Sequence, residues 1–154
     1  MNDENWMQAA ILEARQGIEN GEGGPFGTVI VKDGKIVGRG HNCVLLKKDP
    51  TCHGEMEAIR DACKNLGTHD LSGCVLFTTS EPCPMCLGGI LWANIREIVS
   101  GCTIQDAENI GFRDTVFYDI LNGKTEGKLI RRSLLRGDCL KLFDEYQKST
   151  KTRY

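Results

Sequence analysis

Hydrophobic residues recur at helical spacing near the start of the chain and then at the spacing of strands. Residues 5–19 predict an amphipathic helix that ends at Gly21. Residues 28–40 hold two β-branched runs joined by Asp33 and Gly34, a pair that suits the positive φ angles of a type I′ turn. These runs therefore predict a β-hairpin. The apolar positions of the helix are 6, 7, 10, 11, 14 and 18.

The middle of the chain alternates between helical and strand-like patterns. Residues 53–66 have helical periodicity and end at Gly67. Residues 74–79 are a short apolar run, typical of a strand that is buried on both faces. Residues 83–94 then predict a second, more apolar helix, and residues 96–102 predict another strand.

The remaining segments have weaker patterns. Residues 41–51 predict an irregular connection, and residues 111–121 predict a loop followed by a helical turn. Towards the end of the chain, residues 128–131 are a candidate strand and residues 134–147 a candidate helix. Because no linker, repeat or low-complexity segment interrupts this order, we expect a single domain over residues 1–154.

The order of the elements predicts the architecture. Strand–helix–strand units imply right-handed crossovers between parallel strands with helices on the faces of the sheet. We therefore expect an α/β fold, a three-layer α/β/α domain with a central mixed, largely parallel sheet. In such folds ligands gather at helix N-termini near the carboxyl ends of strands.

Composition narrows the class of protein. The formal net charge is −2, without long runs of one sign, so broad electrostatic binding to nucleic acid or anionic lipid is not expected. No apolar run approaches the ~20 residues of a membrane span. The first residues, MNDENWMQ, are polar and acidic, unlike a signal peptide. These features predict a cytoplasmic protein that neither enters membranes nor depends on nucleic acid.

Eight cysteines are many for 154 residues. In a reducing compartment such thiols are more often buried, metal-bound or catalytic than paired in disulfides. Cys63 and Cys74 lie on apolar patterns and are expected to pack in the core. Only Cys83 and Cys86 have a spacing typical of metal ligands.

The cysteine pair and an upstream histidine form one candidate metal site. His53 begins one predicted helix, and Cys83 and Cys86 begin another, so two helix N-termini can bring the three side chains together. One imidazole and two thiolates suit zinc and leave its fourth position open, as in catalytic zinc sites. Glu55, two residues after His53, is placed to act as a base that later donates its proton to a leaving amine. The pattern indicates hydrolytic removal of ammonia from a ring carbon.

Two other interpretations of the cysteines are open. Cys52 could complete a structural zinc knuckle, although neighbouring residues point in different directions and rarely bind one ion. The pair Cys83 and Cys86 could also be a redox pair, although the upstream His53 and Glu55 do not belong to that motif.

The residues resemble a known signature. His53-Gly54-Glu55 followed by Pro82-Cys83-Pro84-Met85-Cys86 is similar to the H-x-E and P-C-x-x-C motifs of the zinc nucleobase deaminases. The resemblance covers roughly residues 5–120 and implies a cytidine deaminase-like fold. It also implies His53, Cys83 and Cys86 as ligands of Zn²⁺, and Glu55 as the catalytic proton shuttle.

Within that superfamily the chain is most similar to the bacterial guanine deaminases. The loop and hairpin GGPFGTVIVKDGKI and the segment IGFRDTVFY carry this resemblance. It implies homodimers that exchange C-terminal segments, here about residues 122–154. The residues that it implies for substrate binding are Phe26, Asn42, Trp92, Asp114 and Tyr154. Each has an ordinary structural alternative, such as core packing for Phe26 and Trp92, a turn for Asn42 and a helix cap for Asp114.

The resemblance implies hydrolysis of guanine to xanthine and ammonia. Deamination of another free base such as cytosine is an alternative, since RGHN at residues 39–42 is also similar to fungal cytosine deaminase. Deamination of adenosine in tRNA is a further alternative, but the basic tail of those enzymes has no clear counterpart here. A non-catalytic zinc module is a different class of protein, and Glu55 argues against it.

Overall fold

The computed structural model describes residues 2–149 and 153–154, and within them one sheet of four strands in the order β2-β1-β3-β4. The sheet is mixed, as expected, but β3–β4 is its only parallel pairing. The expectation of a largely parallel sheet was therefore wrong, because the hairpin adds two antiparallel pairings beside a single crossover. The strands are β1 (Gly27–Lys32), β2 (Lys35–His41), β3 (Val75–Ser80) and β4 (Glu97–Cys102).

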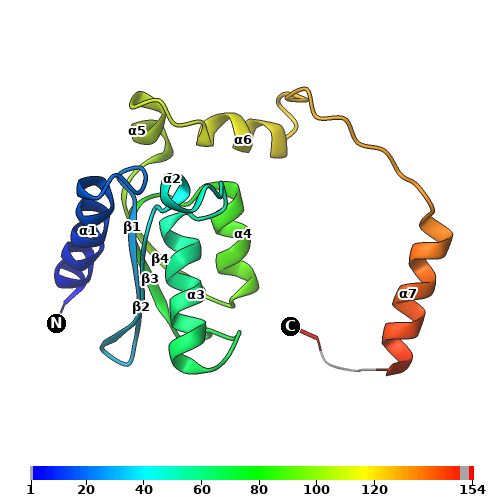
Figure 1. The fold of residues 1–154 in the computed structure, drawn as a ribbon, viewed down its shortest axis with the longest axis horizontal. Coiled ribbons are helices and arrows are strands. Elements are labelled where there is room, and N and C mark those ends of the chain that lie inside the picture. The colour runs from blue at the N-terminus through cyan, green and yellow to red at the C-terminus, as the bar shows by residue number, and fades with distance from the viewer. Residues whose placement is uncertain (1, 150–152) are drawn as a thin grey trace.

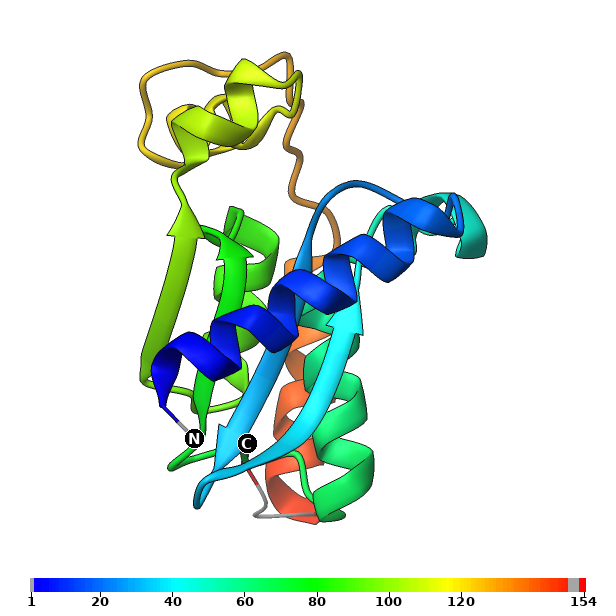
Figure 2. The same cartoon turned by 90° about the vertical axis from the view of Figure 1, so that its left-hand side faces the viewer.

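Helices cover both faces of the sheet, which confirms the three-layer arrangement. Helix α1 (Asp3–Glu19) lies across one face, and α3 (Gly54–Leu66) and α4 (Pro84–Trp92) lie side by side on the other (Figures 1 and 2). Two buried clusters correspond to the two interfaces. The cluster under α1 includes Trp6, Ala10, Val29, Val31 and Phe77, and the one under α3 and α4 includes Ile30, Ala58, Ala62, Leu76 and Ile90.

Local sequence explains where the first elements begin and turn. Asn2 and Asn5 form a reciprocal capping box that pairs backbone N–H groups at the start of α1. Asp33 and Gly34 have φ angles of 49° and 70°, as the predicted hairpin turn requires. The alternating burial of β2 fits a strand with one covered face, whereas β1 is buried along most of its length.

Glycines in the hairpin let the helices approach the sheet closely. A Cβ at Gly40 would lie 2.4 Å from the backbone nitrogen of Ala58 in α3. A Cβ at Gly27 would lie 2.1 Å from the carbonyl oxygen of Ala10 in α1. The hairpin is therefore held between two helix backbones at distances that no larger residue allows.

The remaining helices connect or extend the domain. The short α2 (Val44–Lys47) lies in the segment that was predicted to be irregular, and α5 (Ile104–Asn109) was not predicted. Helix α5 is too short for periodicity to reveal it, although Thr103 and Asp106 form a capping box at its start. Helix α6 (Asp114–Leu121) confirms the predicted helical turn.

The C-terminal segment stands apart from the domain. Residues 122–135 run outward from the end of α6 and lead to α7 (Arg136–Ser149), which lies apart from the sheet and the other helices (Figure 1). Helix α7 confirms the helix predicted near residues 134–147, but the predicted strand at 128–131 is wrong. That segment is exposed and pairs with no strand of the described residues, so its apolar residues gain nothing from an extended conformation. Among the described residues, no helix has the length and apolar character of a membrane span.

We predict that Gly40→Ala lowers the free energy of unfolding by about 2–3 kcal/mol, because overpacking of this kind forces backbone shifts. The measurement is urea denaturation monitored by circular dichroism. Gly88→Ala in α4 is the matched control, because its Cβ would meet no atom within 4 Å. It should leave stability unchanged or raise it by up to about 1 kcal/mol. Equal effects of the two variants would contradict the close packing of α3 on β2.

Candidate zinc and active site

The N-termini of α3 and α4 bring the predicted metal ligands together. His53 precedes the first residue of α3, Cys83 precedes the first residue of α4, and Cys86 lies in the first turn of α4. One ligand atom from each of these residues lies within 4.8 Å of the other two. Pro84 occupies the first turn of α4, where its missing N–H is not needed.

The spacing of the ligand atoms fits a zinc ion. The Nδ1 atom of His53 lies 3.6 Å from Sγ of Cys83. Nitrogen and sulfur ligands at ~2.0 and ~2.3 Å from one tetrahedral zinc lie about 3.5 Å apart. Three protein ligands leave one position for water or substrate, as catalytic sites require.

The electrostatics of the two thiols also favour a cation. Hydrogen bonds with Cys86 and then His53 lower the pKa of Cys83 to about 4. The same contact with Cys83, and burial, raise the pKa of Cys86. Without a cation the two sulfurs share one proton, because two adjacent buried thiolates repel each other. A divalent ion between them removes this repulsion and lets both thiols ionise.

Glu55 lies buried beside this group. Its side chain extends from the first turn of α3 and is 5% exposed. Burial raises the pKa of Glu55 above its usual range, because a low dielectric disfavours the carboxylate. A carboxyl group that holds a proton more readily than usual suits a group that must both accept and donate one.

Two threonines that sequence reasoning missed hold Glu55 in place. The hydroxyl of Thr78 in β3 donates to Oε1 of Glu55 at 3.2 Å. The hydroxyl of Thr28 in β1 donates to that of Thr78 at 3.1 Å. Both threonines are fully buried, so the two central strands orient the carboxylate. The signal for them was weak, because a threonine in a strand is ordinarily a β-branched packing residue.

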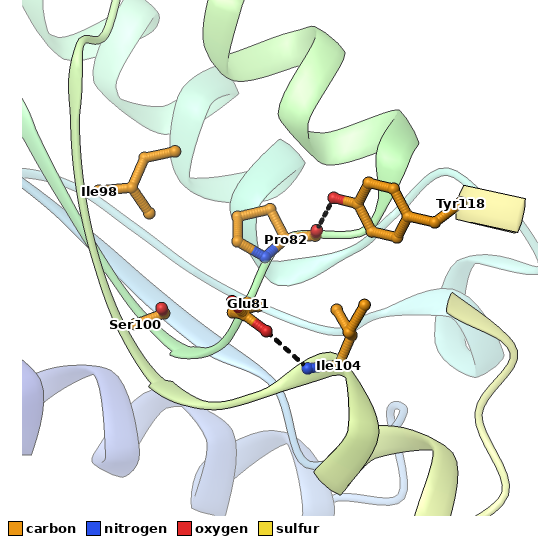
Figure 3. Close-up of a pocket in the computed structure, with 6 residues that line it drawn as sticks. All are labelled: Glu81, Pro82, Ile98, Ser100, Ile104 and Tyr118. Carbon is orange, nitrogen blue, oxygen red and sulfur yellow. Dashed lines mark hydrogen bonds between the residues drawn. The ribbon is translucent and has the colours of Figure 1, made fainter. Parts of the chain in front are cut away.

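A second missed interaction fixes the turn that carries Cys83. The hydroxyl of Tyr118 in α6 donates to the carbonyl oxygen of Pro82 at 2.6 Å, and Oε2 of Glu81 accepts from the N–H of Ile104 at 2.8 Å (Figure 3). These residues line a cavity of about 260 Å³ that lies behind the turn and includes none of the metal ligands. The helices that follow β4 therefore clamp the metal-binding turn from outside.

The loop that carries Phe26 lies against the start of α3, because a Cβ at Gly54, next to His53, would lie 3.1 Å from the carbonyl oxygen of Phe26. Asn42 is 5% exposed, and its backbone N–H donates to the carbonyl oxygen of Phe26 at 2.9 Å. The Phe26 ring packs edge-on against Phe112, with centroids 4.7 Å apart. Burial and then the charge of Cys83 raise the pKa of Asp114, so this carboxylate lies near the ligands. An aromatic face, an amide and a carboxylate suit a flat heterocycle with polar edges.

Two predicted substrate residues lie elsewhere in the single chain. Trp92 ends α4, whereas the metal ligands lie at its beginning, and its side chain is 67% exposed. Tyr154 is 77% exposed, and its ring centroid lies 5.9 Å from that of Trp92. The chain by itself brings neither to the metal group. Cys52 is buried and accepts a hydrogen bond from Arg60, and it is not among the clustered ligands.

The family follows from a sequence comparison. The family model described as the cytidine and deoxycytidylate deaminase zinc-binding region matches residues 1–102, which include the two motifs. The chain belongs to this family of zinc-dependent aminohydrolases, and zinc is its cofactor.

Individual relatives are also similar. The chain is 45% identical to the guanine deaminase of Bacillus subtilis over 130 residues, 84% of this chain and 83% of that protein. The crystal structure of guanine deaminase from the same organism has a TM-score of 0.92 at 38% identity and covers 100% of this chain and 99% of that one. The tRNA-specific adenosine deaminase of Buchnera aphidicola is 32% identical over 147 residues, 96% of this chain and 95% of that protein.

We predict that Thr78→Val lowers kcat by about 10- to 150-fold, because a hydrogen bond to a charged group contributes roughly 1.5–3 kcal/mol and each 1.4 kcal/mol is tenfold in rate. Thr78→Ser keeps the hydroxyl and should retain most of the activity. The measurements are steady-state kinetics and zinc content, which should be unchanged in both variants. A fully active Thr78→Val would show that Glu55 needs no support from β3.

Proposed function

We propose that this protein hydrolyses guanine to xanthine and ammonia. The observation that carries the proposal is the buried Glu55 beside the three-ligand metal group, in a chain similar along its whole length to a guanine deaminase. When bound, zinc lowers the pKa of water and so makes a nucleophile available near neutral pH.

Proton transfer and metal binding are carried out by different residues of the chain. Glu55 accepts a proton from the attacking water and donates one to the amine that leaves from C2 of the purine, so that guanine and water become xanthine and ammonia. Its burial keeps this proton from exchanging freely with solvent. His53, Cys83 and Cys86 hold the metal at the N-termini of α3 and α4.

Specificity for guanine is assigned to Asn42 and Asp114. The side-chain oxygen of Asn42 accepts from the N–H of Val44 at 3.1 Å, which leaves its amide NH₂ to donate to an acceptor on the base. The carboxylate of Asp114 accepts from ring N–H or amine donors on the other edge. Phe26 contributes a face for stacking. A site that forms hydrogen bonds with both edges of guanine rejects bases that lack the matching donors and acceptors.

The test is ammonia release from a panel of guanine, cytosine, adenine, guanosine and a tRNA anticodon arm. Guanine should have the highest kcat/KM. Glu55→Gln should keep its zinc and its fold but lose about 10²–10⁴-fold in kcat, because the amide cannot carry the proton. A wild type that prefers cytosine or the tRNA arm would overturn the proposal, and an active Glu55→Gln would place the base elsewhere.

The C-terminal segment supports a homodimer. Leu142 and Phe143 on α7 are 61% and 71% exposed, and Leu91 and Trp92 on α4 are 51% and 67% exposed. Apolar faces of this kind mark interaction sites. A second copy that exchanges residues 122–154 would cover both surfaces. A role of Tyr154 in the substrate pocket depends on this exchange and stays a prediction.

We predict a mass of two chains by size-exclusion chromatography with light scattering. Phe143→Asp should dissociate the dimer at micromolar concentration, because it places a charge in the apolar contact. Glu145→Gln, on an exposed position of the same helix, is the matched control and should remain dimeric. A monomeric wild type, or a dimeric Phe143→Asp, would contradict the exchange of α7.

A reducing compartment such as the cytoplasm is also proposed. All eight cysteines are described and free, and five of them are buried. Free thiols in this number persist where disulfides are kept reduced.

A further inference from the structure

A second group of metal-type ligands lies at the corner where β2 leaves the sheet. Glu22 follows α1 in the loop, His41 is the last residue of β2, and Cys43 precedes α2. One ligand atom from each lies within 4.8 Å of the other two. None of these residues belongs to the group formed by His53, Cys83 and Cys86.

The distances suit a tetrahedral zinc after a small movement. Sγ of Cys43 lies 3.8 Å from Oε2 of Glu22, and oxygen and sulfur ligands of one zinc lie about 3.5 Å apart. Nε2 of His41 lies 2.5 Å from the same oxygen, whereas nitrogen and oxygen ligands lie about 3.3 Å apart. The carboxylate of Glu22 therefore has to withdraw by less than about 1 Å, which its side chain can do by rotation.

The surroundings of His41 are built to orient its ring. Nδ1 of His41 lies 3.1 Å from Oε2 of Glu13 in α1. Metal-binding histidines almost always donate their second N–H to such a partner, which leaves the other nitrogen free to bind the ion. Gly17 makes room for the ring, since a Cβ there would lie 2.7 Å from Cδ2 of His41. The side chains of Glu13, Glu22 and His41 are only 13–18% exposed.

The alternative is a protonated imidazole bridging two carboxylates, with no metal. That arrangement accounts for Glu13, His41 and Glu22, and the thiol of Cys43 then donates to the carbonyl oxygen of His41 at 3.3 Å. However, Cys43 is 7% exposed, and its Sγ also lies 3.8 Å from the carboxylate oxygen that His41 contacts. Imidazole, thiolate and carboxylate together are a zinc-type ligand set.

We propose that Glu22, His41 and Cys43 form a second zinc site, with Glu13 as the residue that orients His41. The ion would replace the proton shared by His41 and Glu22 and the thiol proton of Cys43, both of which pass to solvent. Two of the proposed ligands, His41 and Cys43, line a surface cavity of about 500 Å³, which gives an ion access to them from solvent.

The second zinc site would affect the position of Asn42, which is proposed to bind the substrate. Asn42 lies between two of its ligands, and the Asn42 backbone N–H already pairs with Phe26. An ion that joins residues 41 and 43 to the loop at residue 22 would restrict the backbone on both sides of Asn42. If the proposed function holds, occupancy should lower the KM for guanine and leave kcat largely unchanged. The metal count below does not depend on that function.

The test is equilibrium dialysis of the purified holoenzyme against micromolar Zn²⁺, followed by elemental analysis. The wild type should bind two equivalents per chain, and His41→Gln and Cys43→Ser one. Cys83→Ala should lose the first equivalent and keep the second, whereas Cys102→Ser, at an exposed thiol, should keep both. Glu13→Gln should bind the second ion about 10–100-fold more weakly, as expected of a partner that only orients the histidine.

A spectroscopic measurement identifies the ligands without reference to activity. Co²⁺ added to protein that carries one equivalent of zinc per chain should produce a thiolate-to-cobalt absorption band that is absent in Cys43→Ser and present in Cys102→Ser. A wild type that binds one equivalent only would overturn the proposal. A second equivalent that survives both His41→Gln and Cys43→Ser would overturn it as well.

Discussion

The active site depends on the close approach of two helices on one face of the sheet. His53 and Glu55 come from α3, and Cys83 and Cys86 come from α4, so the metal group exists only if these two N-termini meet. Small residues set their positions. Gly40 admits the backbone of α3 onto β2, and a Cβ at Gly89 in α4 would lie 2.7 Å from Sδ of Met56 in α3. Since protein interiors are close-packed, such contacts leave the helices little freedom to slide.

The sheet contributes chemistry as well as support. Burying a carboxyl group is costly unless it is hydrogen-bonded, and Glu55 receives its partner from Thr78, which is in turn paired with Thr28. The central strands therefore hold the carboxyl group of Glu55, the proposed general base, while Tyr118 holds the turn that carries Cys83. The metal ligands, the carboxyl group of Glu55 and the central strands are therefore neighbours in one buried region.

The sequence predicts the local features well and the global ones less well. His53, Glu55, Cys83 and Cys86 could be placed at helix starts because capping and periodicity depend on neighbouring residues. The balance of parallel and antiparallel pairings could not, because strand order depends on contacts between distant segments. The strand expected at 128–131 failed for a related reason, since its apolar residues find no strand partner within the described chain. Thr28 and Thr78 were invisible because only the pairing of β1 with β3 brings them to Glu55.

The proposed base-binding residue Asn42 lies next to His41, which belongs to the polar cluster packed against α1. Asn42 is held by its backbone contact with Phe26 and by the contact of its side chain with Val44, so its amide direction is set by the path of the chain between β2 and α2. That path is set in turn by His41, which is held between Glu13 and Glu22. Binding of the proposed ion at His41 would therefore act on Asn42 through one peptide unit, without a longer route through the core. The proposed contact of Asn42 with the base is in this way linked to the polar cluster against α1, whereas the metal group comes from α3 and α4.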